Sequence, residues 1–150
     1  MPGDIINSPI ESRHPVDVAF GAKELDPRQQ RLLDKLPAYG SEAVVKKRDV
    51  SMLDLSAMTA ATGDEFALFT KGKERLVVRG GLLHGIHGVP VNPERAQALK
   101  AQGYKWSGHT HPEVNIVPSG GDRAVLEAFE QNQSVIYNPF GRFIHFGRDW

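Results

Sequence analysis

Residues 109–122 constrain the fold of this chain more than any other stretch, because they indicate a strand, a loop and a helix in immediate succession. Segment 104–111 is expected to be a strand, and a proline stands at each end of the segment 112–118 that follows it. Because proline has no backbone N–H and cannot continue a helix or a central strand, 112–118 is predicted to be a loop. Ser119 then begins a helix that extends to about residue 131. The sequence therefore places the end of a strand and the start of a helix on either side of one short loop.

Three side chains in this stretch have the spacing of a metal site. His109 and His111 are two residues apart, so on an extended strand both imidazoles point to one face and can converge on one point. Asp122 lies in the first turn of the expected helix, where the dipole favours the ionised carboxylate that a metal requires. Two imidazoles and a carboxylate are a common ligand set for a catalytic zinc, with a fourth position left for water. Ser119-x-x-Asp122 is also an ordinary helix-capping pattern, so it supports a metal site only because the two histidines precede it.

The composition excludes several other kinds of site. The chain has 150 residues, about the size of one domain, and its 18 basic residues balance 18 acidic ones. A neutral chain lacks the broad positive field that nucleic-acid binding usually needs. The absence of cysteine excludes disulfides, thiolate zinc sites and a cysteine nucleophile. No apolar run approaches the ~20 residues that span a bilayer, and the N-terminus has no signal-peptide pattern. We therefore expect neither a membrane nor nucleic acid as a partner.

The rest of the chain predicts helices and strands in mixed order with short connections. Residues 1–24 contain three prolines and two glycines and are expected to form an irregular arm or linker, with a short strand at 16–20. Expected helices are 27–36, 51–62, 93–101 and 119–131, and expected strands are 43–50, 65–70, 75–79, 104–111, 134–138 and 142–146. This order predicts a single α+β domain over 25–150, with a mixed sheet flanked by helices and one extra N-terminal helix. Tyr104 and Trp106 are expected to pack in the core, on the strand face opposite His109.

A hydrolytic zinc site also needs a group that takes the proton from water, and a carboxylate usually serves. The acids that could fill this role are Asp64, Glu65, Glu74, Glu94 and Glu113. Chemistry alone does not choose among them.

The pattern His109-x-His111-x7-Ser119-x-x-Asp122 resembles the signature of the JAMM (JAB/MPN) zinc metallopeptidases. That family is otherwise defined by one glutamate upstream, at the start of a strand that follows a helix. Glu65 holds this place, because it follows the expected helix 51–62 and stands 44 residues before His109. The element order of residues 51–147 also looks like the family's core, so the resemblance covers about two-thirds of the chain. It implies a curved, mixed sheet with a cytidine-deaminase-like core.

The resemblance implies a role for each residue of the motif. His109, His111 and Asp122 would be the ligands of one catalytic zinc ion. Glu65 would be the general acid/base that acts on the bound water, and Ser119 would donate a hydrogen bond to the tetrahedral oxyanion. The implied reaction is hydrolysis of a peptide or isopeptide bond in a protein or peptide substrate, in the family often a ubiquitin or ubiquitin-like protein. Phe66-Ala67 replaces the Cys-Gly or Gly-Gly pair of many members, so the packing of this strand is expected to differ.

Three segments are similar to a narrower group, the JAB-type modules at the C-terminal ends of large bacterial secreted or polymorphic-toxin proteins. These segments are 62–72, 103–112 and 133–141. The likeness implies export as part of a larger protein and activity in the cytoplasm of a target cell. It also implies a cognate immunity protein that covers the metal cleft.

Two other functions remain open at this stage. The first is a non-catalytic MPN-like binding or assembly module; such relatives generally lack one or more metal-site residues, whereas this chain has all five. The second is metal-dependent hydrolysis of another bond, such as a phosphodiester in nucleic acid. Two histidines and an aspartate suit that chemistry, but the neutral charge and the motif spacing favour it less.

Overall fold

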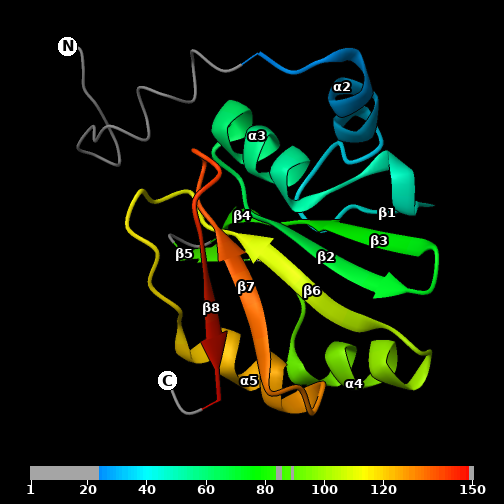
Figure 1. Cartoon of the computed structure of the whole chain (residues 1–150), viewed down its shortest axis with the longest axis vertical. Coiled ribbons are helices and arrows are strands. Elements are labelled where there is room, and N and C mark those ends of the chain that lie inside the picture. Colours follow the sequence, from blue (N-terminus) through cyan, green and yellow to red (C-terminus); the bar gives the residue numbers. More distant parts are fainter. Residues whose placement is uncertain (1–23, 84–85, 89, 149–150) are drawn as a thin grey trace.

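A six-stranded mixed sheet runs through the middle of the structure (Figure 1). The structure is a computed structural model that describes residues 24–83, 86–88 and 90–148. In spatial order the strands of this sheet are β1 (Glu42–Lys46), β3 (Glu74–Arg79), β2 (Phe66–Lys71), β6 (Lys105–Thr110), β7 (Gln133–Tyr137) and β8 (Phe143–Gly147). Neighbouring strands are antiparallel except β6 and β7, which are parallel. A separate two-stranded sheet contains β4 (Gly81–Leu83) and β5 (Ile86–Gly88).

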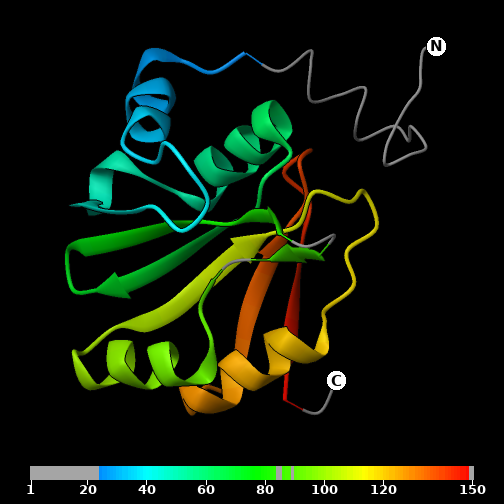
Figure 2. The same cartoon turned by 180° about the vertical axis from the view of Figure 1, so that it is seen from behind.

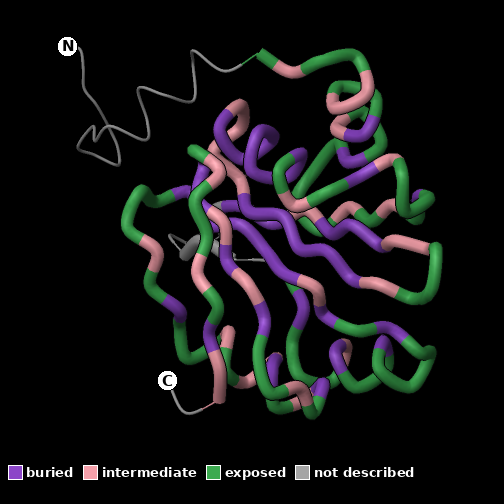
Figure 3. Tube along the Cα trace, in the orientation of Figure 1, coloured by how far each residue is buried: buried purple, intermediate pink, exposed green. Residues whose placement is uncertain are grey.

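Helices cover both faces of the sheet, as Figures 1 and 2 show from opposite sides. The helices are α2 (Pro27–Asp34) and α3 (Met52–Thr62) on one face, and α4 (Pro93–Ala101) and α5 (Gly120–Ala128) on the other. Each face has its own hydrophobic core, because successive residues of β2 point in opposite directions: Phe66 and Leu68 pack toward α3, whereas Ala67 and Phe69 pack toward α4 and α5. Figure 3 shows the buried residues gathered in the central strands and in α3. The expected single α+β domain is confirmed for the described residues.

The helices begin at the residues that the sequence predicts as caps. Asp26, Ser51, Asn92 and Ser119 each accept a hydrogen bond from the backbone N–H three residues later. α3 ends at Gly63, whose φ of +79° lies in the left-handed region that glycine adopts at little cost.

Several element ends differ from the sequence-based expectation. β1 covers 42–46 instead of 43–50, because its partner β3 begins at Glu74, which faces Lys46, and leaves the next residues unpaired. Those residues form a short 3-10 helix, η1 (Lys47–Asp49). α5 ends at Ala128 rather than near residue 131, and Glu130 has a positive φ of 55°. The expected arm over 1–24 and the strand at 16–20 lie outside the described residues, which begin at Glu24. Among the helices of the described part, none is long and apolar enough to cross a membrane.

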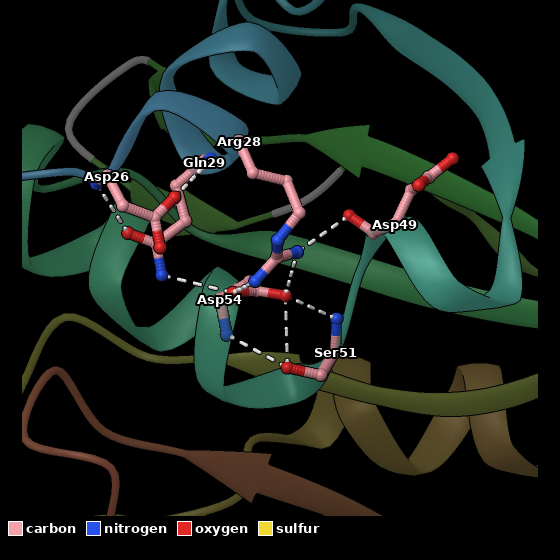
Figure 4. Close-up of polar contacts among 6 residues, drawn as sticks. All are labelled: Asp26, Arg28, Gln29, Asp49, Ser51 and Asp54. Carbon is pink, nitrogen blue, oxygen red and sulfur yellow. Dashed lines mark hydrogen bonds and ion pairs between the residues drawn. The ribbon is translucent and has the colours of Figure 1, made fainter.

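The extra N-terminal helix α2 is joined to α3 by a polar network around Asp54 (Figure 4). Arg28 donates two hydrogen bonds to the Asp54 carboxylate, at 2.7 and 2.8 Å, and Gln29 donates a third at 3.0 Å. The backbone N–H of Ser51 donates to the same carboxylate at 2.8 Å. Arg28 also donates to the carbonyl oxygen of Asp49. Burial would raise the pKa of Asp54, but the hydrogen bonds from Arg28, Gln29 and Ser51 hold it below its ordinary value of 3.8.

A β-bulge in β6 sets the direction of the side chains that follow it. Leu68 pairs with Gly108 and Phe69 pairs with Trp106, so Ser107 is an extra residue in β6. The hydroxyl of this residue hydrogen-bonds that of Thr70. Because the bulge interrupts the alternation, Trp106 and His109 lie on the same face, and their rings stack with centroids 5.0 Å apart. The expected core packing of Trp106 is confirmed, but the prediction that it lies opposite His109 is wrong.

Candidate metal centre

The five site residues predicted from the sequence line one cavity of about 480 Å³. Glu65 immediately precedes β2, and His109 lies on the neighbouring strand β6, where it is paired with Ala67. His111 follows the end of β6, and its backbone N–H donates to Tyr137 O at 2.9 Å. Ser119 and Asp122 are the N-cap and the third residue of α5. The loop between β6 and α5 therefore brings the ends of these two elements to one point.

The two histidines and the Asp122 carboxylate lie within contact distance of one another. The Nε2 atoms of His109 and His111 are 3.1 Å apart. The carboxylate oxygens of Asp122 lie 3.0 Å from His109 Nε2 and 3.4 Å from His111 Nε2. With zinc–ligand bonds of about 2.0–2.1 Å, two donors of a tetrahedral zinc lie about 3.3 Å apart. The separation of the two Nε2 atoms and the two contacts of the Asp122 carboxylate, one through each oxygen, are close to this value.

The imidazole of His109 is oriented by aromatic packing. Its other ring nitrogen, Nδ1, is buried and has no hydrogen-bond partner among the described residues, whereas many metal-binding histidines donate this N–H to a carboxylate or carbonyl. The ring instead stacks on Trp106 and meets the edge of Phe146, with a centroid distance of 6.0 Å. Nε2 is consequently the nitrogen that faces the cavity.

Glu65 lies beside the two histidines and is buried, with 6% of its surface exposed. Potential ligand atoms of Glu65, His109 and His111 all lie within 4.8 Å of one another. Burial raises the pKa of Glu65 to about 8; the charge of His111 opposes this shift, and the charges of Glu113 and Asp122 reinforce it. A carboxyl group with this pKa can both accept and release a proton near neutral pH.

Of the five acidic residues that could serve as the base, the structure distinguishes Glu65 from the other four by its surroundings. Asp64 forms an ion pair of 2.7 Å with Arg79. Glu74 accepts a hydrogen bond from the hydroxyl of Tyr104, and Glu94 lies in the first turn of α4 outside the cavity. Glu113 lines the cavity but is exposed. Glu65 alone among the five combines burial with proximity to both histidines.

The pKa values of the two histidines and Asp122 are shifted by burial and by their contacts with one another. Burial holds the pKa of His109 below its ordinary value of 6.5, although Asp122 opposes the shift. Burial would also lower the pKa of His111, but its hydrogen bond with Asp122 and the charge of Glu65 raise it. Burial opposes ionisation of Asp122, yet the hydrogen bonds from both histidines hold its pKa far below 3.8. Asp122 is therefore ionised at neutral pH, as a metal ligand must be.

The capping interpretation of Ser119-x-x-Asp122 is also confirmed, and it is compatible with a metal site. The Asp122 N–H donates to Ser119 Oγ at 3.1 Å, and the Ser119 N–H donates to Asp122 Oδ2 at 2.8 Å. The other carboxylate oxygen, Oδ1, faces His109. Ser119 Oγ accepts a bond here, so its own O–H remains able to donate toward the cavity that Ser119 lines.

Sequence reasoning missed one residue that supports the site, Thr110. Thr110 lies between the two histidines in the sequence, and its side chain points to the opposite face of β6. There its hydroxyl forms a hydrogen bond of 2.6 Å with the hydroxyl of Thr59 in α3. The same oxygen accepts the backbone N–H of Phe66, next to Glu65, at 2.9 Å. Strand alternation could have indicated the direction of Thr110, but its partners are far away in the sequence.

No protein-family model, curated protein or solved structure matches this chain. Its function is therefore argued from the site.

Proposed function

We propose that the chain is a zinc-dependent hydrolase that cleaves a peptide or isopeptide bond with the chemistry of the JAMM (JAB/MPN) metallopeptidases. The observation that supports this proposal best is the convergence of His109, His111 and Asp122 at distances of 3.0–3.4 Å, with Glu65 buried beside them. A fully protein-ligated structural zinc commonly uses four side chains, whereas three ligands leave the open position of a catalytic site.

Each residue has a separate part in the proposed reaction. His109, His111 and Asp122 would hold the zinc, and the chemistry that the bound ion would supply is the activation of a water molecule and the polarisation of the substrate carbonyl. Glu65, buried beside the two histidines, would accept the proton of the attacking water and pass it to the nitrogen of the leaving amine. Ser119 donates its O–H to the oxygen on which negative charge develops.

The sequence resemblance extends the proposal to the biological setting. The substrate is a protein or peptide, with ubiquitin-like proteins as one class to test. The chain acts as the toxin domain of a larger bacterial secreted protein, and a cognate immunity protein covers the cavity. A protein encoded beside the parent gene that binds the chain and blocks hydrolysis would support this setting, and the lack of any such neighbour would count against it.

Metal content and hydrolysis test the proposal together. Purified, zinc-supplemented protein is expected to hold about one zinc per chain. Glu65→Gln should keep the zinc and lower hydrolysis by about 10²–10⁴-fold, because it removes the proton-transfer group. His109→Ala should lose the zinc. Glu127→Gln on α5 and His145→Ala on β8, both exposed, are the matched controls and should change neither property. Protein that binds no zinc under these conditions contradicts the proposal.

Assays with different substrates distinguish the proposed function from its two alternatives, phosphodiester hydrolysis and a non-catalytic binding module. The zinc form is incubated with ubiquitin-like conjugates, with peptides and with nucleic acid, each beside Glu65→Gln. Cleavage of nucleic acid that Glu65→Gln abolishes would replace the proposal by phosphodiester hydrolysis. A zinc-bound chain that hydrolyses none of these substrates would favour the binding-module alternative.

A further inference from the structure

The cavity extends beyond the candidate metal centre into an apolar region. Its ionisable lining residues belong to the metal centre or, in the case of Glu113, lie beside it. The remaining wall carries no charged side chain, and we define the apolar pocket as its six hydrophobic residues: Ala67, Phe69, Val91, Trp106, Val117 and Val125. The whole cavity, at about 480 Å³, has the size of ordinary ligand sites, which range over roughly 300–1,000 Å³.

The apolar pocket is built from the same elements as the metal centre. Ala67 is paired with His109 across β2 and β6, and Phe69 follows it on the same face. On the facing side, Val125 lies three residues after Asp122, so it is one turn further along α5. The pocket therefore begins beside the donor atoms and continues between the sheet and α5.

A small residue, Ala67, stands next to His109 in the lining of the cavity. Ala67 ends at its methyl group, although it stands beside the larger rings of Phe69 and Trp106. Ala67, Phe69 and Trp106 are packed in the core and form the floor of the pocket, whereas Val117, which is 63% exposed, and the half-buried Val125 present most of its accessible apolar surface.

We propose that the apolar pocket binds an aliphatic or aromatic side chain of the residue that flanks the scissile amide, and that the substrates are chains with such a residue at that position. This inference rests on the proposed hydrolase function and adds a substrate class to it. The transfer of an apolar side chain from water into the pocket lowers the free energy. A charged side chain would lose its hydration there without meeting a charged partner. Glycine at the same position would leave the pocket unfilled. A pocket of this kind discriminates by about 10- to 200-fold for a small change in apolar bulk.

Binding of amino-acid hydroxamates tests the pocket without requiring turnover, because the hydroxamate group coordinates zinc and the side chain probes the pocket. Dissociation constants are measured on zinc-loaded protein for the hydroxamates of glycine, leucine, phenylalanine and aspartate. Fluorescence of Trp106, in a Trp150→Phe background that leaves one tryptophan, reports occupancy. The leucine and phenylalanine compounds are expected to bind at least about 10-fold more tightly than the glycine compound, and the aspartate compound no more tightly.

Filling the pocket should remove this preference. Ala67→Leu and Val125→Phe, on opposite walls, are expected to bring the leucine and phenylalanine compounds to the affinity of the glycine compound. Val125→Ala should shift the preference toward phenylalanine. Ala98→Leu, at an exposed position on α4, is the matched control and should behave as wild type. Two filling variants are used because Ala67 is buried and its enlargement can impair folding.

The outcomes separate this inference from the function on which it rests. If the glycine compound binds and the leucine and phenylalanine compounds bind no better, the pocket proposal is overturned and the zinc site stands. If the protein holds no zinc, the proposed function and the pocket proposal are overturned together.

Discussion

Thr110 shows how a single side chain can hold three parts of the candidate site together. Its hydroxyl contacts Thr59 of α3 and the backbone N–H of Phe66, and both threonine residues are fully buried. Because Thr110 lies between His109 and His111, these bonds fix the end of β6 against the residue that follows Glu65. We therefore expect Thr110 to act as a positioning residue that sets the distance between the proposed base and the proposed metal ligands.

Replacement of Thr110 by valine should keep the shape and remove both hydrogen bonds. Two buried polar groups would lose their partner, so the free energy of unfolding should fall by about 1–3 kcal/mol. We also expect kcat to fall with little change in KM and with the zinc retained, and the pH profile of kcat to shift because Glu65 moves relative to the histidines. Urea unfolding, zinc content and kinetics check this.

Thr110→Ser is the matched control for that variant, since it keeps the hydroxyl and should retain most of the stability and activity. A Thr110→Val protein that is destabilised but has an unchanged kcat and pH profile would restrict Thr110 to a purely structural role.

Much of the candidate site can be predicted from the sequence, because the relative positions of residues within one strand or one helical turn follow from their spacing. His109 and His111 converge because an uninterrupted stretch of strand alternates, and Ser119 and Asp122 form a helix cap within one turn. Trp106 could not be placed from its spacing, because the bulge at Ser107 depends on pairing with β2. The apolar pocket was missed for a similar reason: its residues come from distant segments and have no motif.

At the scale of elements, Asp54 connects α2 to α3 by polar contacts, beside the buried side chains of Leu32 and Leu36, and should contribute to the attachment of α2. Asp54→Asn removes the negative charge that Arg28 and Gln29 contact, and we expect the free energy of unfolding to fall by about 1.5–3 kcal/mol. The exposed end of Arg28, whose side chain is 41% accessible, favours the lower part of that range because solvent screens the pair.

The effect of Asp54→Asn should depend on pH in one direction. The pKa of Asp54 in the folded chain lies below 3.8, so its contribution to stability is complete above that pH and is lost as the pH falls through the lower, folded value. The difference between wild type and Asp54→Asn should therefore be constant near neutrality and shrink in acid. Chemical unfolding from about pH 7 to pH 3 measures it, with the exposed Asp34→Asn as control. A difference that stays constant into acid would contradict the assignment.

Element starts were easier to predict than element ends. Each helix start depends on a cap three residues from its partner, so Asp26, Ser51, Asn92 and Ser119 were readable from the sequence. The end of β1 depends on where its partner strand begins, because Lys46 faces the first residue of β3. That information lies 28 residues away and has no local signal.

At the scale of the whole molecule, the candidate metal centre joins parts that belong to different layers. His109 lies in the sheet, His111 directly follows strand β6, and Asp122 comes from a helix that covers one face. A bound zinc would therefore link the sheet to α5 and would favour the folded state, in which alone the three donors meet.

Zinc removal should lower the thermal stability of the chain. At a free zinc concentration about 100 times the dissociation constant, binding adds about 2.7 kcal/mol to the free energy of unfolding. For a chain of this length that corresponds to a rise in Tm of roughly 5–10 °C. Thermal unfolding with zinc and with a chelator measures the shift. His109→Ala should abolish it and His145→Ala should preserve it; equal Tm values in wild type would count against the site.

Because β6 contains an extra residue, a deletion within this strand would change which side chains face the cavity. Removing Ser107 would restore regular alternation, so either Trp106 or the pair of histidines would turn to the face covered by α3. A deletion of one codon would thereby either separate the proposed ligands from Asp122 or remove Trp106 from its stack on His109, although composition and hydrophobic pattern would hardly change. Evolutionary drift along this strand should accordingly proceed by exchange of residues, with insertions and deletions confined to the loops.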